Sequence, residues 1–71
     1  MIREGTKVEW NWSGSKASGK VKEVFKDDVT RTIGGNEVTR EASEDEPAYL
    51  IEQEDGDRVL KSASEVTRVD D

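Results

Sequence analysis

The sequence predicts an all-β protein, a small barrel of about five short, strongly bent strands. Three observations lead to this fold class. Short runs alternate apolar and polar residues, Gly, Asn and Asp separate these runs, and no stretch shows the longer period of a helix. With 71 residues the chain is too short for a two-sheet sandwich, so we expect one domain over residues 1–71.

The first strand is predicted over residues 6–12, where Val8, Trp10 and Trp12 alternate with polar residues and share one face. Such a pattern is typical of a strand with one buried side. Residues 13–19 contain only Ser, Gly, Lys and Ala, so we expect a mobile loop without an apolar anchor.

A second strand is predicted over residues 19–26, but its apolar pattern is broken. Val21 and Phe25 fall on one face, and Val24 falls on the other. A β-bulge between Val21 and Val24 would turn all three side chains toward one core, and small barrels need such bends to close. The two aspartates at 27–28 end this strand.

Two further runs, 29–33 and 37–40, flank a Gly-Gly-Asn turn signal at residues 34–36 and predict a hairpin. The acidic residues 41–46 then form a connection that ends at Pro47, a residue tolerated at the start of an edge strand. So many charges in one short run predict a surface segment.

The clearest turn signal is Asp55-Gly56, between the predicted strands 48–53 and 58–61. We expect a type I′ turn, in which both central residues have positive φ. A Val in place of Gly56 should then cost about 1–3 kcal/mol of folding free energy, and a Val at Gly14, in the expected loop, much less.

The rest of the chain predicts a 3₁₀ turn at residues 62–65 and a short final strand at residues 66–69. The core is expected to consist of large apolar and aromatic side chains from several strands. The candidates are Val8, Trp10, Val21 and Phe25, with either Leu50 or Tyr49.

Composition restricts the chemistry. The chain has no Cys and no His, so neither a disulfide nor a zinc site is expected, and its carboxylates lack the spacing of a calcium loop. No nucleophile is paired with a base, so the sequence predicts no catalytic residues, no cofactor and no enzyme activity. The chain opens with charged residues instead of an apolar run, which predicts a cytoplasmic protein that does not enter a membrane.

Charge is unevenly distributed along the chain. The net charge is −6, and residues 41–57 contain eight carboxylates and no Lys or Arg. Nucleic-acid binding usually requires a basic surface. We therefore expect a protein or peptide partner with a cationic surface, while acidity that only maintains solubility is the simpler alternative.

Four segments follow one another in a recognisable order: Gly5-x-x-Val8-x-Trp10-x-Trp12, Gly19-x-Val21-x-x-Val24, Ala42-Ser43-x-x-x-Pro47-Ala48-Tyr49 and Gly56-x-x-Val59-Leu60-Lys61-x-x-Ser64-Glu65-Val66. With these segments the chain, from Gly5 to about Val69, resembles the hypervirulence-associated Tudor-domain family. The resemblance implies a Tudor-like, SH3-like barrel. It implies little about biochemistry, because this family is described by its fold and by a phenotype and not by a reaction.

Tudor domains that bind methylated Lys or Arg hold the cation in a cage of aromatic rings, often beside a carboxylate. Trp12 is left for the surface, and so is Tyr49 if the core does not need it. The two rings could then form a partial cage beside Glu44, Asp45 and Glu46. These five residues are the predicted ligand-binding site. The alternative is that the rings serve only the core and that Trp12 covers the open end of the barrel.

Two other functions stay open on the sequence alone. A nucleic-acid-binding accessory barrel would use Trp12 as a stacking ring beside a basic strip formed by Lys16, Lys20, Lys22, Lys26 and Arg31. The apolar residues 47–51 could instead pair with a second copy along a strand edge, so that the protein would be a monomer or a weak homo-oligomer.

Overall fold

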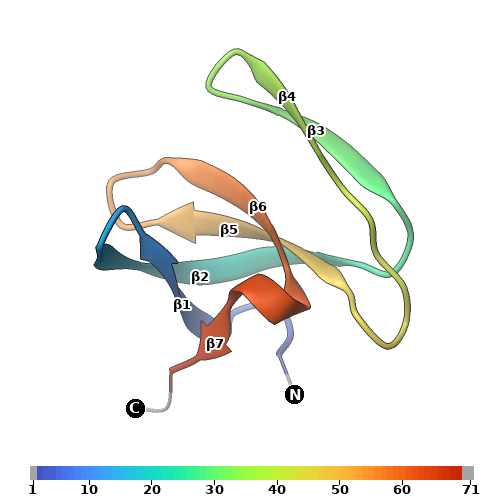
Figure 1. Cartoon of the computed structure of the whole chain (residues 1–71), viewed down its shortest axis with the longest axis horizontal. Helices are drawn as coiled ribbons and strands as arrows, with labels where there is room; N and C mark the ends of the chain where they lie inside the picture. Colours follow the sequence, from blue (N-terminus) through green and yellow to red (C-terminus); the bar gives the residue numbers. More distant parts are fainter. Residues whose placement is uncertain (1, 70–71) are drawn as a thin grey trace.

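The computed structural model describes residues 2–69, which form an all-β protein (Figure 1). The strands are β1 (Lys7–Trp12), β2 (Ser15–Phe25), β3 (Val29–Ile33), β4 (Asn36–Arg40), β5 (Ala48–Gln53), β6 (Arg58–Ser62) and β7 (Thr67–Arg68), and the one 3₁₀ helix is η1 (Ala63–Glu65). The predicted fold class is confirmed. No helix in this part of the chain is long and apolar enough to cross a membrane.

Five strands form one antiparallel sheet in the order β6-β5-β2-β1-β7, and β3 and β4 form a separate hairpin. The sheet is bent, and η1 leads from β6 to β7, so the arrangement is barrel-like (Figure 1). The β3–β4 hairpin stands above β6 in this view and encloses a second apolar cluster against the sheet.

The main core lies on the inner face of the sheet and consists of Val8, Trp10, Val21, Tyr49, Ile51 and Val66, each exposed by 9% or less. Tyr49 and Leu50 are both buried, because β5 is covered on both faces. Leu50 belongs to the second cluster, under the β3–β4 hairpin, with Val29, Ala48 and Leu60. A continuous apolar run is typical of a strand that is buried on two sides.

The predicted bulge is present in β2. The pairing of β2 with β5 shifts between Val21 and Glu23, so that Lys22 is the extra residue. The shift moves Val24 to the inner face, where it packs against the main core. Phe25 then lies on the other face and packs against the second cluster, so the prediction that all three apolar residues of this strand share one core is wrong for Phe25.

The expectation of a mobile loop at residues 13–19 is wrong. β2 begins at Ser15, which pairs with Trp12 across a two-residue turn. The turn residues Ser13 and Gly14 have φ values of 46° and 81°, and a type I′ turn needs this left-handed conformation at both positions. Serine rarely adopts a positive φ, which is why this hairpin was not apparent from the sequence.

The predicted hairpin of β5 and β6 is confirmed, but its turn is not of type I′. Gly56 has a φ of 92°, whereas Asp55 does not have a positive φ. The N–H of Gly56 donates to the carbonyl of Gln53 at 2.9 Å, and the N–H of Gln53 donates to the carbonyl of Asp57 at 2.7 Å. These bonds define a longer loop, a type I turn followed by a bulge with glycine in the left-handed conformation.

Residues 47–51 do not provide the strand edge that self-association was expected to use, because β5 is paired with β2 on one side and with β6 on the other. The open edges of the β3–β4 hairpin are partly covered by guanidinium groups. Arg31 donates to the carbonyl of Thr30 at 2.9 Å, and Arg40 donates to the carbonyl of Thr39 at 3.0 Å. These bonds occupy carbonyl groups that an added strand would need.

Candidate functional site

Of the two rings predicted to bind a ligand, only Trp12 is accessible. Trp12 is 65% exposed at the end of β1, whereas Tyr49 is 4% exposed in the main core. Burial also raises the pKa of the Tyr49 hydroxyl. The expected pair of neighbouring surface rings is therefore not formed, and Trp12 is too exposed to cover the core as a lid.

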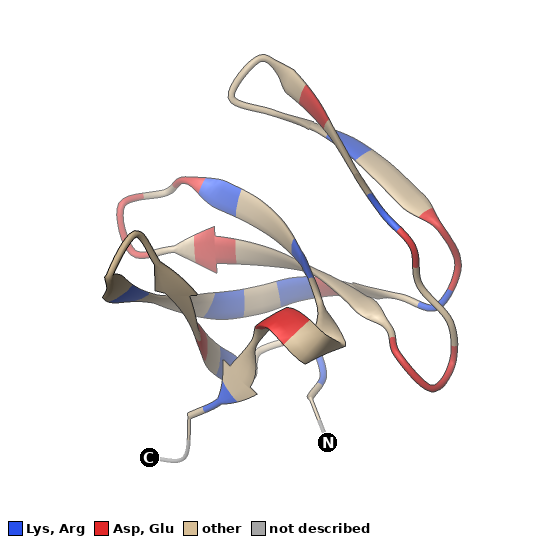
Figure 2. Ribbon diagram, viewed as in Figure 1, with Lys and Arg blue, Asp and Glu red and all other residues tan. Residues whose placement is uncertain are grey.

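The acidic part of the predicted site lies at the other end of β5. Glu44, Asp45 and Glu46 are exposed in the connection before this strand, while Trp12 lies beside Gln53 at its end. A strand of this length spans about 20 Å. Figure 2 shows the acidic connection and the β1–β2 turn on opposite sides of the molecule. The structure therefore does not bring the five predicted residues together.

Trp12 instead lines a groove between two hairpin turns at one end of the sheet. The β1–β2 turn and the β5–β6 turn lie at the same end of the molecule (Figure 1). The groove has a volume of about 270 Å³. We call it the Trp12 groove; its lining residues are Trp10, Trp12 and Ala17 from β1 and β2, and Gln53, Asp57, Val59 and Lys61 from the β5–β6 hairpin.

Strand alternation explains how these side chains meet. Trp10 and Trp12 are two residues apart on β1 and share its inner face, and Val59 and Lys61 are related in the same way on β6. β7 pairs with only two residues of β1, so β1 continues beyond the covered part of the sheet. Trp10, 5% exposed, therefore forms the floor of the groove, and Trp12 forms a wall.

The two ends of the Trp12 groove carry opposite charges. At the turn end, Asp57 is exposed, and its N–H donates to Oδ1 of Asp55 at 3.0 Å, which fixes the turn. At the end near η1, the Lys61 side chain is 16% exposed, and its Nζ lies 3.9 Å from Oε2 of Glu65. Between these ends the groove offers the apolar surfaces of Val59 and the tryptophan rings. Such a groove can hold a cation, an apolar side chain, or both.

Glu65 connects the β3–β4 hairpin to the end of β6. Its Oε1 accepts hydrogen bonds from Nε of Arg40 and from the N–H of Ser62, each at 2.9 Å. Desolvation would raise the pKa of Glu65, but the hydrogen bonds from Ser62 and Arg40 and the charge of Arg40 outweigh it and lower the pKa. Glu65 is therefore ionised at neutral pH and holds η1 against the hairpin.

Comparison with known families assigns the chain. The family model of the hypervirulence associated proteins TUDOR domain matches residues 5–66. The chain belongs to this Tudor-domain family. The match includes every residue of the Trp12 groove. No curated protein and no solved structure matches the chain. As a Tudor domain, the protein is a small binding module, and the family does not specify its partner.

In this Tudor domain, three of the five cations in the basic strip considered for nucleic-acid binding form ion pairs with carboxylates. Its ion pairs are Lys16–Glu9 at 3.3 Å, Lys22–Glu52 at 3.7 Å and Arg31–Glu23 at 3.8 Å. Arg31 also lies over the Phe25 ring, 4.7 Å from its centroid. The strip therefore offers a phosphate backbone fewer unpaired cations than the sequence suggested.

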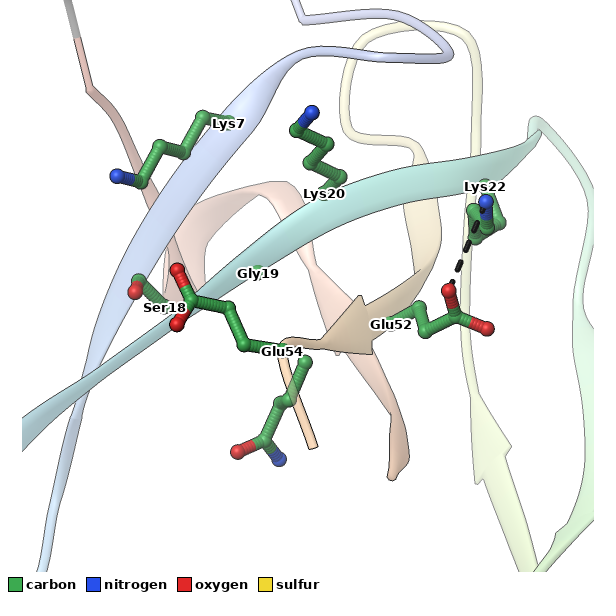
Figure 3. A pocket seen from close by; sticks show the side chains of 8 residues that line it. Lys7, Ser18, Gly19, Lys20, Lys22, Glu52 and Glu54 are labelled. Carbon is green, nitrogen blue, oxygen red and sulfur yellow. Dashed lines mark ion pairs between the residues drawn. The ribbon is translucent and has the colours of Figure 1, made fainter. Parts of the chain in front are cut away.

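Lys20, another member of the strip, lies opposite Lys7 on the outer face of β1 and β2. Figure 3 shows both side chains at a shallow depression, together with the ion pair of Lys22 and Glu52. Neither Lys7 nor Lys20 forms an ion pair within residues 2–69. Glu52 and Glu54 line the same depression, so this outer surface of the Tudor domain has mixed charge.

Sequence reasoning identified Trp12 but missed the partners that the Tudor domain places beside it. The predicted two-residue turn would set Lys61 opposite Leu50, whereas the extra residue of the observed turn sets Lys61 opposite Tyr49. Residues opposite each other on paired strands share a face, and so do alternate residues along a strand. In the observed register Val59 and Lys61 therefore share the inner face with Tyr49, and the predicted turn type placed them on the opposite face.

Proposed function

We propose that this Tudor domain binds an extended, basic segment of a protein or peptide in the Trp12 groove. The exposure of Trp12 carries the proposal, because within residues 2–69 it is the only large hydrophobic side chain that is exposed. Tryptophan is a frequent anchor in binding sites, since its ring buries a large area at a small cost in conformational entropy. Asp57 lies in the same groove and favours a cationic ligand.

The expected affinity is modest. A Lys or Arg side chain over the Trp12 ring gains about 0.5–1 kcal/mol from cation–π attraction at an exposed site. An exposed ion pair with Asp57 adds about 0–1 kcal/mol. Apolar contact with Val59 and Ala17 must supply the rest, so we expect dissociation constants between about 1 µM and 1 mM. The net charge of −6 favours encounters with basic partners.

Strong selection for methylated lysine is not part of this proposal. A methyl-lysine cage surrounds the cation with several ring faces. Tyr49 lies in the main core, Phe25 is covered by Arg31 and Trp10 is 5% exposed, so Trp12 offers the one open ring face within residues 2–69. We therefore expect methylation of the bound lysine to change the affinity less than removal of its charge.

NMR titration of the isotope-labelled protein with acetylated, amidated pentapeptides tests the proposal. We expect the peptide Lys-Ser-Val-Ser-Gln to bind about three- to tenfold tighter than Gln-Ser-Val-Ser-Gln, because only the first carries a cation. Trp12→Ala should weaken binding of the lysine peptide by about tenfold or more. Lys20→Ala, on the outer face, is the control and should leave the affinity unchanged.

Two results would contradict the proposal. One is equal binding of the lysine peptide by the parent protein and by Trp12→Ala. The other is the absence of shifts at Trp12 with every peptide, together with shifts at Lys7 and Lys20 on addition of single-stranded DNA. The second result would favour nucleic-acid binding through the outer face, especially if added salt reversed it steeply.

A further inference from the structure

An acid, an apolar residue and a base lie at alternate positions along one side of the Trp12 groove: Asp57 directly before β6, and Val59 and Lys61 on its inner face. Asp57, Val59 and Lys61 all line the Trp12 groove. The carbonyl of Asp57 accepts a hydrogen bond from the N–H of Gln53 at 2.7 Å, so Asp57 continues the pairing of β6 with β5. Alternate residues of a strand lie about 6.6 Å apart, so the backbone positions of Asp57 and Lys61 are separated by about 13 Å. The groove therefore has a defined electrostatic direction, from a carboxylate at the open turn to an ammonium group near η1.

The positive charge of Lys61 is poorly neutralised for a side chain that is largely buried. Its side chain is 16% exposed, and its one ion pair within residues 2–69 is the contact of 3.9 Å with Oε2 of Glu65. The other oxygen of Glu65 accepts bonds from Arg40 and Ser62, each at 2.9 Å. Thus one carboxylate serves two cations, and the closer cation is Arg40. A partly buried charge with a distant partner is costly, and a nearby anion reduces that cost.

We propose that the Trp12 groove recognises an extended segment that carries a basic and an acidic side chain four residues apart. The basic side chain lies at Trp12 and Asp57, and the acidic side chain lies at Lys61. An apolar side chain midway between them lies over Val59. The proposal rests on the proposed function and deepens it, because it defines the ligand as a segment with paired charges instead of a merely basic one.

The spacing follows from strand geometry. In an extended segment, side chains at i, i+2 and i+4 point to one face and cover about 13 Å, which matches the separation of Asp57 and Lys61 along the groove. A side chain at i+3 points to the opposite face. An acidic residue at i+3 therefore leaves the composition of the segment unchanged but cannot reach Lys61.

Three acetylated, amidated pentapeptides isolate this effect in NMR titrations. Lys-Ser-Val-Ser-Glu has the proposed spacing, Lys-Ser-Val-Glu-Ser has the same composition with the acid at i+3, and Lys-Ser-Val-Ser-Gln has no acid. We expect the first peptide to bind about three- to tenfold tighter than either of the others, which is the effect of one partly screened ion pair. The preference is measured on the parent protein and does not depend on whether any variant folds.

Substitution of Lys61 assigns the preference to a single group. Lys61→Met keeps most of the length of the side chain and removes its charge, so the variant should bind all three peptides with equal affinity. Lys61→Arg should retain the preference. Lys22→Met removes a paired lysine outside the groove and is the control, for which the preference should be unchanged.

Failure of this inference differs from failure of the proposed function. Equal affinities for the three peptides, with shifts at Trp12 in each case, would overturn the inference and leave binding of basic segments intact. A preference that survives in Lys61→Met would also overturn it. Absence of shifts at Trp12 with all three peptides would contradict the proposed function and the inference together.

Discussion

Replacement of Gly19 by alanine tests how closely β2 and β5 approach each other. Gly19 lies within β2, paired with Val8 on β1 and with Gln53 on β5. A Cβ atom at this position would lie 2.5 Å from the carbonyl oxygen of Glu52 and 2.8 Å from Cγ2 of Ile51. The carbonyl belongs to the backbone of a central strand, so it cannot rotate away as a side chain would.

Overpacking a protein core usually costs about 1–3 kcal/mol, because side chains and backbone shift to make room. In the Gly19→Ala variant, the backbone of β5 must move and its ladder hydrogen bonds must lengthen. We therefore expect a loss of about 3 kcal/mol of folding free energy, at the upper end of that range. A small domain without disulfides has a total stability of only about 5 kcal/mol, so the variant should retain about 2 kcal/mol and unfold at a much lower urea concentration than the parent.

Urea unfolding, followed by tryptophan fluorescence, measures this loss. Gly14→Ala is the matched control, because no atom lies within 4 Å of an added Cβ and only the φ of 81° opposes the substitution. The control should lose about 1–2 kcal/mol, the usual cost of the left-handed conformation for a residue with a Cβ. If Gly19→Ala loses no more stability than Gly14→Ala, the close approach of β2 and β5 is refuted.

Three further predictions concern the turns and the titratable groups. Gly14→Val and Gly56→Val should each lose about 1–3 kcal/mol of folding free energy in urea unfolding, because both glycines have positive φ. A negligible loss for Gly14→Val would instead favour the mobile loop that the sequence suggested. The pKa of Glu65 is lowered in the folded protein, so its contribution to stability is present above its ordinary value of 4.5 and is lost as the pH falls through the folded-state pKa. Glu65→Gln should therefore show a smaller loss of stability on acidification than the parent, and identical acid unfolding profiles would argue against the contacts of Glu65. The pKa of Tyr49 is raised above 10.0, so absorbance titration should show tyrosinate only at higher pH. The stability that the neutral, buried Tyr49 contributes should be lost as the pH rises from 10.0 through the folded-state pKa. Ionisation at or below the ordinary value would show that Tyr49 is not buried.

Most hairpins of this Tudor domain could be predicted from local chemistry. Glycine provides the positive φ that tight turns require, and the hairpins around residues 34–35 and 55–56 were recognised from this signal. The hairpin at Ser13-Gly14 was missed because serine is disfavoured at a φ of 46°. The conformational cost of Ser13 is offset because all of β1 pairs with β2. The residues near the turn do not reveal this contribution.

The exposure of Trp12 was predictable from its position at a strand end, but the burial of Tyr49 was not. Residues 48–51 do not alternate between apolar and polar, so the sequence does not indicate which face of the strand Tyr49 lies on. Ala48 and Leu50, on the other face of β5, are covered by the β3–β4 hairpin, which is held in place by contacts distant in sequence, such as that of Arg40 with Glu65. Local patterns do not determine such contacts. The acidic connection lies far from Trp12 because β1 and β5 flank β2 and run in the same direction, and this strand order is also not fixed by local patterns.

Intermolecular nuclear Overhauser effects between the protein and the pentapeptide Lys-Ser-Val-Ser-Glu test most directly whether the Trp12 groove is the binding site. The groove predicts contacts from the peptide lysine to the ring of Trp12 and from the peptide valine to Val59. Contacts instead to Lys7 and Lys20 on the outer face, or to the acidic connection at residues 44–46, would contradict it.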